Sequence, residues 1–143
     1  IDPLATVVLE KAEHIVIVTQ QSLAHIRDAK RLLKVLTSTL AVPSEYITVV
    51  VNRYMERSPI SLRDISDAIS PPHLAILPND FQSVSQALDV GSPLFELNRD
   101  LPITRALCDL LDTLLSDGAA TPPSPQEPRP KGLRAVLAHA LRS

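Results

Sequence analysis

The sequence has 143 residues, enough for one ordinary domain. Hydrophobic residues make up 45% and charged residues 21%, a balance typical of a folded protein and not of a disordered one. Its three glycines lie far apart, so the sequence contains neither a Walker A loop nor a GxGxxG fingerprint. The single cysteine, Cys108, excludes an internal disulfide and a multi-cysteine zinc site, and it favours a reducing setting. No apolar run reaches the roughly 18–20 residues of a membrane span.

Charge and proline are unevenly distributed along the chain. Residues 1–118 carry 10 basic and 15 acidic side chains, whereas residues 119–143 carry 4 basic and 1 acidic. Prolines crowd into the segment 122–130, which has too few apolar residues to pack. We therefore predict a folded body over 1–118, a linker over 119–130 and a basic tail over 131–143. Because the chain begins with Ile1 and not with methionine, we also expect it to be a piece of a longer protein.

Three short apolar runs, at 14–19, 46–51 and 74–77, predict β-strands. They are continuous and not alternating, which is typical of strands buried on both faces. Amphipathic helical patterns separate them, so the order predicts parallel βαβ units with helices on both faces of the sheet. The expected fold class is α/β, the C-terminal part of a doubly wound parallel sheet. Three strands alone leave an unpaired edge, which again indicates that a neighbouring part is missing.

Helical patterns fill the segments around these runs, and most begin at a residue that favours a helix N-terminus. A weaker pattern covers 4–12, and the pattern after the first strand extends to about Leu40. Gly91 is expected to end the fourth helix. The residues expected to begin the later helices are Ser22, Ser61 (in a capping box with Asp64), Asp80 and Pro102.

Polar side chains follow each expected strand. In parallel sheets ligands bind beyond the carboxyl ends of the strands, so we expect a binding site there. The Asn52 carboxamide carries a donor and an acceptor side by side and can pair with the edge of adenine. Alternatively, these residues only cap helices or close turns, the usual role of Asn, Asp and Ser. The segments concerned are Thr19-Gln20-Gln21-Ser22, Asn52-Arg53-Tyr54 and Pro78-Asn79-Asp80.

Three stretches, in order, resemble the C-terminal half of the MinD/ParA class of deviant P-loop ATPases. They read IVIVTQQSLAHIRDAKRLL, ITVVVNRY and LPNDFQSVSQALDVGSPL, and the resemblance covers about residues 1–116. It is closest to the pilus-assembly branch called CpaE or TadZ. The resemblance implies a MinD/ParA-like P-loop NTPase fold over 1–118, followed here by the linker and a short amphipathic helix.

The resemblance also implies a nucleotide-binding role for particular residues. In that class the asparagine closing the VVNR strand lies against the adenine base, which corresponds to Asn52, with Arg53 beside it. The proline-containing turn after the next strand forms the other wall of the base pocket, which corresponds to Pro78, Asn79 and Asp80.

A helix with the pattern RDxxR lies, in that class, near the face used for nucleotide-dependent dimerisation and partner contact. Here the matching residues are Arg27, Asp28 and Arg31. The alternative is a solvated helix face, which is a common place for charged side chains.

The phosphate-binding loop and the magnesium-binding residues of that class have no counterpart in this sequence. The resemblance therefore implies ATP or ADP with Mg as cofactors of a longer parent, whereas the chain alone is expected to bind none tightly and not to hydrolyse ATP.

We predict no catalytic residue and no metal site, because the four histidines are scattered. Cys108 lies in an apolar helical pattern and is expected to pack as a small hydrophobe. No basic stripe interleaves with aromatic residues, so direct nucleic-acid binding is not expected.

The tail has the pattern of a basic amphipathic helix, which can lie at the surface of an anionic bilayer. In form it resembles the C-terminal membrane-targeting helix of MinD. The alternative is an ordinary terminal helix that docks on its own domain or on a partner. The residues expected to contact the membrane are Lys131, Leu133, Arg134, Val136, Leu137 and Leu141.

Taken as a whole, the resemblance implies a pilus-assembly protein of the Flp/Tad type. It would act as a nucleotide-binding homodimer in the bacterial cytoplasm and place the secretion machinery at the inner membrane or the cell pole. Two alternatives stay open: an active ATPase of the cell-division or plasmid- or chromosome-partition branch, and a structural adaptor that binds no nucleotide.

Overall fold

The computed structural model of the chain describes residues 3–117. The predicted linker and tail lie outside the described residues. Among residues 3–117, no helix combines the length and the apolar character needed to cross a bilayer. The elements, in chain order, are α1 (Pro3–Lys11), β1 (Ile15–Thr19), α2 (Leu23–Lys34), a π-helical turn (Val35–Thr39), a 3-10 turn (Ser44–Tyr46), β2 (Ile47–Tyr54), α3 (Leu62–Ile69), β3 (His73–Pro78), α4 (Phe81–Val90), α5 (Leu94–Leu97) and α6 (Pro102–Asp117).

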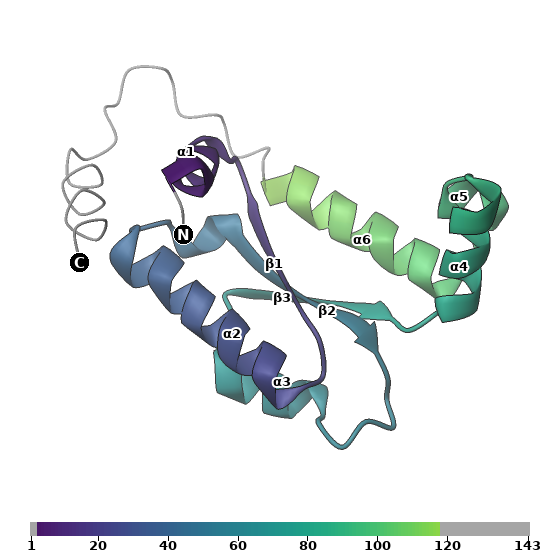
Figure 1. Ribbon diagram of the computed structural model, residues 1–143, viewed down its shortest axis with the longest axis horizontal. Coiled ribbons are helices and arrows are strands. Elements are labelled where there is room, and N and C mark those ends of the chain that lie inside the picture. The colour runs from purple at the N-terminus through teal and green to yellow at the C-terminus, as the bar shows by residue number, and fades with distance from the viewer. Residues whose placement is uncertain (1–2, 118–143) are drawn as a thin grey trace.

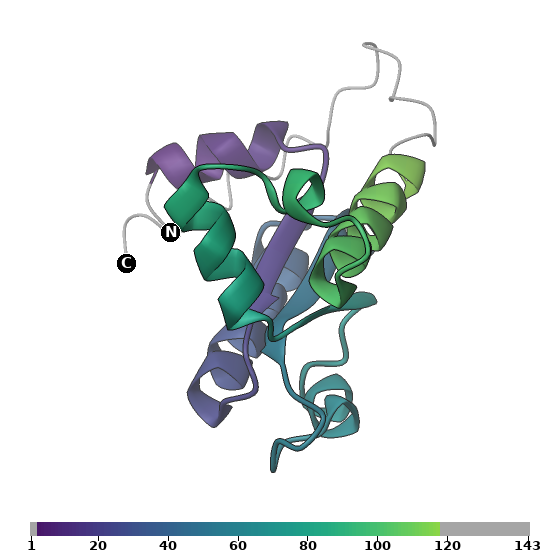
Figure 2. The same ribbon diagram turned by 90° about the vertical axis from the view of Figure 1, so that its right-hand side faces the viewer.

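The three predicted strands form one parallel sheet in the order β1-β2-β3. Helices α2 and α3 lie on one side of this sheet and α6 on the other (Figure 1). Figure 2, turned by 90°, shows α1 and α6 on either side of the β1 ribbon. The expected α/β fold class is therefore confirmed. Because the strands are parallel, their carboxyl ends all reach the same edge of the sheet.

The main core lies between the sheet and helices α2 and α3. In the register of the sheet Ile17 lies beside Val49, and Val49 lies beside Leu74, so these three side chains share one face. Ile26, Ala29 and Leu33 recur at helical spacing along α2 and are buried against that face. Leu36 and Leu40, in and after the π-helical turn, extend the same core. The apolar periodicity of α2 thus fixes which side of the helix meets the sheet.

The opposite face of the sheet is covered over β2 and β3 and is open over β1. Val50, in the centre of β2, is 1% exposed, and Ile103 and Thr104 of α6 are buried on that side. On β1, however, Val16 is 39% and Val18 is 62% exposed. The expectation that the first strand is buried on both faces is therefore wrong for this chain. Packing within the described residues thus leaves Val18 mostly exposed and Val16 partly exposed.

Most of the predicted helix ends are confirmed. Ser61 and Asp64 form a reciprocal capping box, and the Asp80 carboxylate accepts a hydrogen bond from the Ser83 amide at 3.1 Å. Gly91 ends α4 with φ of 71°, a conformation that suits glycine. Ser22 occupies the N-cap position of α2, but its side chain forms no cap hydrogen bond. The helix α5 and the 3-10 turn were not expected from the sequence.

The capping box at the start of α3 provides a direct test of local stability. We expect Ser61→Ala to lower the free energy of unfolding by about 1 kcal/mol, because the Asp64 amide loses its acceptor. The measurement is urea unfolding at neutral pH. Arg63→Ala is the matched control on the same turn, since that side chain is 89% exposed. A Ser61 variant as stable as the control would contradict the role of the cap.

The same box predicts an acid-dependent loss of stability. Hydrogen bonds from the Ser61 side chain and backbone hold the pKa of Asp64 below its usual value. The lowered pKa stabilises the fold at a pH above the unfolded pKa of about 3.9, and this contribution is lost as the pH falls through the lower, folded pKa. In Asp64→Asn this component of the acid transition should be missing. Unfolding followed from pH 6 to pH 2 measures it.

Candidate functional site

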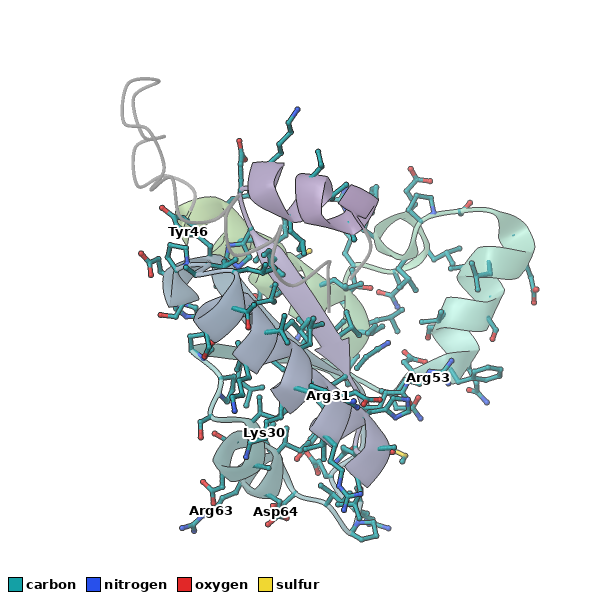
Figure 3. The ribbon with its side chains drawn as sticks, turned by 60° about the vertical axis from the view of Figure 1, so that its left-hand side comes forward. Lys30, Arg31, Tyr46, Arg53, Arg63 and Asp64 are labelled. Atoms are coloured by element: carbon teal, nitrogen blue, oxygen red, sulfur yellow. The ribbon has the colours of Figure 1, made fainter. Side chains whose placement is uncertain are left out.

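The carboxyl ends of β1, β2 and β3 meet around an open pocket of about 280 Å³. Figure 3 shows Arg53 at this end of the sheet, near the start of α2. Three segments far apart in the sequence contribute to the pocket, as expected where the ends of parallel strands come together. The lining residues are Gln20, Gln21, Ser22, Arg53, Met55 and Asn79.

The backbone of β2 is distorted where it reaches the pocket. Pairing between β2 and β3 shifts register between Val51 and Tyr54, and Arg53 has a φ of 54°. The Arg53 amide donates to the Asn52 side-chain oxygen at 2.9 Å. A left-handed conformation is uncommon for an arginine, and such residues concentrate at functional sites. The distortion therefore marks this end of β2 as a candidate site on geometric grounds.

The segment that follows β2 is held from both neighbouring strands. The Gln21 side chain, after β1, accepts from the Met55 amide at 2.7 Å. Its Nε2 donates to the carbonyl oxygens of Met55 at 3.2 Å and Ile60 at 2.8 Å. From the β3 side, the Asn79 amide donates to the Tyr54 carbonyl at 3.0 Å. These bonds join the ends of all three strands into one rim.

Two of the five predicted nucleotide-binding residues, Arg53 and Asn79, line the pocket. Asn52 is half-buried beside it, with its side-chain oxygen engaged by the Arg53 amide. Pro78 ends β3. Asp80 caps α4, which is the alternative role that the sequence analysis gave for this residue. Asn52, Pro78 and Asp80 are not lining residues, and their assignment to a base pocket stays a prediction.

Sequence reasoning placed Gln20, Gln21 and Ser22 among the polar strand ends, assigned only Ser22 a role as a helix N-cap, and missed Met55. The sequence did contain a signal for a shared site at these residues. Polar residues that directly follow a buried strand lie at its carboxyl end, and parallel strands bring these ends together. The contact between Gln21 and Met55 spans 34 positions and leaves no local pattern in the sequence.

The charged residues predicted for dimer or partner contact lie on α2. Arg27, Asp28 and Arg31 are exposed, and Figure 3 shows Arg31 on the outer surface of the helix. Arg31 forms an ion pair with Asp28, in which the side chains are 75% and 66% exposed. An exposed pair of this kind contributes little to stability, so packing does not explain these charges.

The pocket suits part of a nucleotide better than a whole one. Carboxamides of Gln20 and Asn79 offer donors and acceptors for a base or ribose, and Arg53 offers a cation. A volume of about 280 Å³ is slightly below the range for small-molecule pockets, roughly 300–1,000 Å³. Among the described residues there is no cluster of three His, Cys, Asp or Glu that could hold a metal ion. The carboxamides that line the pocket are of the type that can hydrogen-bond a nucleotide base.

Two further side chains differ from simple expectation. Cys108 is exposed on α6, so the prediction that it packs as a small hydrophobe is wrong. The reason is that α6 buries its other side and turns Cys108 toward solvent. At the end of β1, the Thr19 hydroxyl is buried without a hydrogen-bond partner among the described residues. An unsatisfied buried hydroxyl costs roughly 1–3 kcal/mol.

Comparisons with known proteins support the fold. No protein-family model matches the chain, and no curated protein sequence matches it. A ParA family ATPase from Chlorobium tepidum TLS is similar in structure, with a TM-score of 0.67 and 27% identity over 76% of this chain and 45% of its own. The MinC:MinD cell division protein complex of Aquifex aeolicus gives a TM-score of 0.64 and 23% identity over 90% of this chain and 52% of the other. The chain thus spans about half the length of these structures.

The left-handed conformation of Arg53 predicts an unusual order of stabilities. We expect Arg53→Gly to raise the free energy of unfolding by about 0.5 kcal/mol. The left-handed conformation costs a residue with an L side chain roughly 1–2 kcal/mol, and the entropic cost of ordering a glycine is smaller. Arg53→Val should lower it by about 1 kcal/mol or more, because a β-branched residue is poorly tolerated at positive φ. Denaturant unfolding measures both. Arg57→Gly, in an exposed turn without positive φ, should give no gain.

Proposed function

Because the chain has the α/β fold of the MinD/ParA P-loop proteins, we propose that it is the C-terminal part of a nucleotide-binding positioning factor of that class. The observation that carries the proposal is the pocket at the strand ends, with Arg53, Asn79 and two glutamine carboxamides around it. In this proposal the pocket receives the adenine base of ATP or ADP. Asn52 lies against one side of the base, and the turn Pro78-Asn79-Asp80 forms the other wall. Polypeptide outside this sequence holds the phosphates and Mg.

The exposed side of β1 supports the proposal that more of the sheet precedes this chain. Val16 and Val18 are exposed on a strand whose second edge has no partner among the described residues. Large apolar side chains on a sheet face are normally covered, and an open strand edge favours pairing with a further strand. In the proposed parent, a neighbouring strand and its helix cover both features.

Nucleotide binding in this proposal controls a homodimer. Helix α2 starts directly after pocket residues Gln21 and Ser22, and its outer surface carries Arg27, Asp28 and Arg31. The same helix thus joins the pocket to the proposed dimer or partner surface. Dimerisation doubles the number of membrane or partner contacts per particle. Nucleotide in the pocket, by favouring the dimer, therefore strengthens binding to the membrane or partner surface.

The process we propose is the assembly of a Flp/Tad-type pilus, with components of the secretion machinery as partners. The support is the sequence resemblance of the strand ends and of α2 to the CpaE/TadZ branch. The protein then acts in the bacterial cytoplasm, at the inner membrane and at the cell pole. The basic amphipathic tail, residues 131–143, supplies a peripheral membrane contact.

An active ATPase of the cell-division or partition type is the second candidate, and the 27% identity to a ParA family ATPase favours it. A lysine-rich phosphate loop upstream, together with ATP turnover by the full-length protein, distinguishes it from the positioning factor that binds without turnover. A structural adaptor without nucleotide is distinguished by the next experiment.

The proposed base pocket is tested by Asn52→Ala in the full-length protein. We expect its affinity for ATP and ADP to fall about tenfold, the equivalent of one lost hydrogen bond with its packing. Isothermal titration calorimetry measures the affinity. Gln82→Ala, which removes an exposed carboxamide on α4 away from the pocket lining, is the matched control. An unchanged affinity in Asn52→Ala favours the adaptor.

The proposed membrane contact is tested on the tail. The protein should sediment with vesicles that contain anionic lipid, and Leu137→Glu should abolish sedimentation because it puts a charge on the apolar face. Ala138→Glu adds the same charge outside that face and should reduce binding only slightly. An equal loss in both variants indicates charge attraction without insertion, and no sedimentation of the unsubstituted protein argues for docking on protein instead.

A further inference from the structure

The Gln21 carboxamide has more polar contacts with the segment after β2 than any cap or turn requires. It forms three hydrogen bonds, one accepted from the Met55 amide at 2.7 Å and two donated to the carbonyls of Met55 and Ile60 at 3.2 and 2.8 Å. Both Nε2 hydrogens and one Oε1 lone pair are used in this way. Since Gln21 is separated from these partners by 34 and 39 positions, the bonds are tertiary contacts.

The two bonds with Met55 reproduce the pairing of a neighbouring strand. One residue gives its N–H to the carboxamide oxygen and receives the carboxamide N–H on its own carbonyl, as in a ladder of backbone bonds. On the opposite side, the backbone amide of Asn79 donates to the carbonyl of Tyr54. The stretch from Arg53 to Met55 is therefore fixed from the β1 side by a side chain and from the β3 side by the backbone.

This stretch needs such support because of its own conformation. Arg53 is left-handed, with φ of 54°, and the register between β2 and β3 is already broken there. A residue held in a sparsely populated region persists only when its surroundings fix it. Arg53, Met55 and Gln21 all line the pocket, so the bonds that fix the segment also set the shape of the pocket.

We propose that Gln21 is a positioning residue for nucleotide binding: its carboxamide holds the segment after β2 so that Asn52 and Arg53 are set for the base. This inference rests on the proposed function. Gln21 acts through Met55 and Ile60 and does not itself recognise the nucleotide. Because Gln21 directly precedes Ser22, the N-cap of α2, the same contact ties the pocket to the start of that helix.

The first test uses the 143-residue chain without nucleotide. Hydrogen exchange of the Met55 amide should accelerate about tenfold in Gln21→Ala, since its acceptor is lost. Gln21→Glu keeps an acceptor for this amide and loses both donors, so the exchange of Met55 should stay closer to that of the unsubstituted chain. Gln20→Ala is the matched control, because it removes a neighbouring carboxamide of the pocket that forms no side-chain hydrogen bond with the described residues. Unchanged exchange in Gln21→Ala overturns the proposal.

The second test measures the affinity of the full-length protein for ADP. We expect about a tenfold loss in Gln21→Ala, a smaller loss in Gln21→Glu, and no change in Gln82→Ala, which removes an exposed carboxamide on α4 outside the pocket lining. The graded order distinguishes positioning from a general loss of folding, which thermal melts of the same variants would reveal. Faster Met55 exchange with unchanged ADP affinity overturns the positioning role and leaves the proposed function intact. If the unsubstituted protein binds no ADP, the proposed function fails, while the exchange experiment still reports on the Gln21 contact.

Discussion

Parallel pairing of β2 with both of its neighbours is the constraint from which the rest of the structure follows. Ile47, Val49 and Val51 are fully buried toward α2 and α3, and Thr48 and Val50 are 1% exposed on the opposite face. Burial on both faces is what a central strand of a parallel sheet requires, and β2 is the strand that pairs with both others. Because both pairings are parallel, all three carboxyl ends lie together. A pocket at that edge is a consequence of the topology, before any particular side chain is considered.

The residues at that edge combine local strain with long-range support. Arg53 adopts a conformation that costs an L-residue roughly 1–2 kcal/mol, and the Thr19 hydroxyl is buried without a partner among the described residues. Three hydrogen bonds from Gln21 offset part of this cost, each contributing about 1 kcal/mol net. Stability is therefore given up at the strand ends, while the centre of β2 carries the core. This division is common at binding sites, where surrounding contacts keep residues in backbone conformations that they would not adopt by themselves.

The features predictable from the sequence are those encoded by near neighbours. The box of Ser61 and Asp64, the cap by Asp80 and the end of α4 at Gly91 each depend on residues within one turn of a helix, and all are confirmed. The strands followed from continuous apolar runs for the same reason. By contrast, the exposure of Val18 depends on what lies beside β1, and the role of Gln21 depends on partners 34 and 39 positions away. Periodicity carries no information on either, nor on the side of α6 that Cys108 occupies.

The exposed side of β1 and the pocket belong to the same strand, and this gives the proposed function a physical logic. Val16 and Val18 lie on the uncovered face, and Thr19 and Gln21 lead from the end of that strand to the pocket. Polypeptide that packs on β1 to bury the valines therefore arrives directly beside the pocket. In the proposed function, that same polypeptide supplies the groups that hold the phosphates and Mg. Burial of apolar surface supplies the free energy for this packing, and the polar rim supplies the specificity. Completion of the sheet and completion of the nucleotide site are, in this proposal, one structural event.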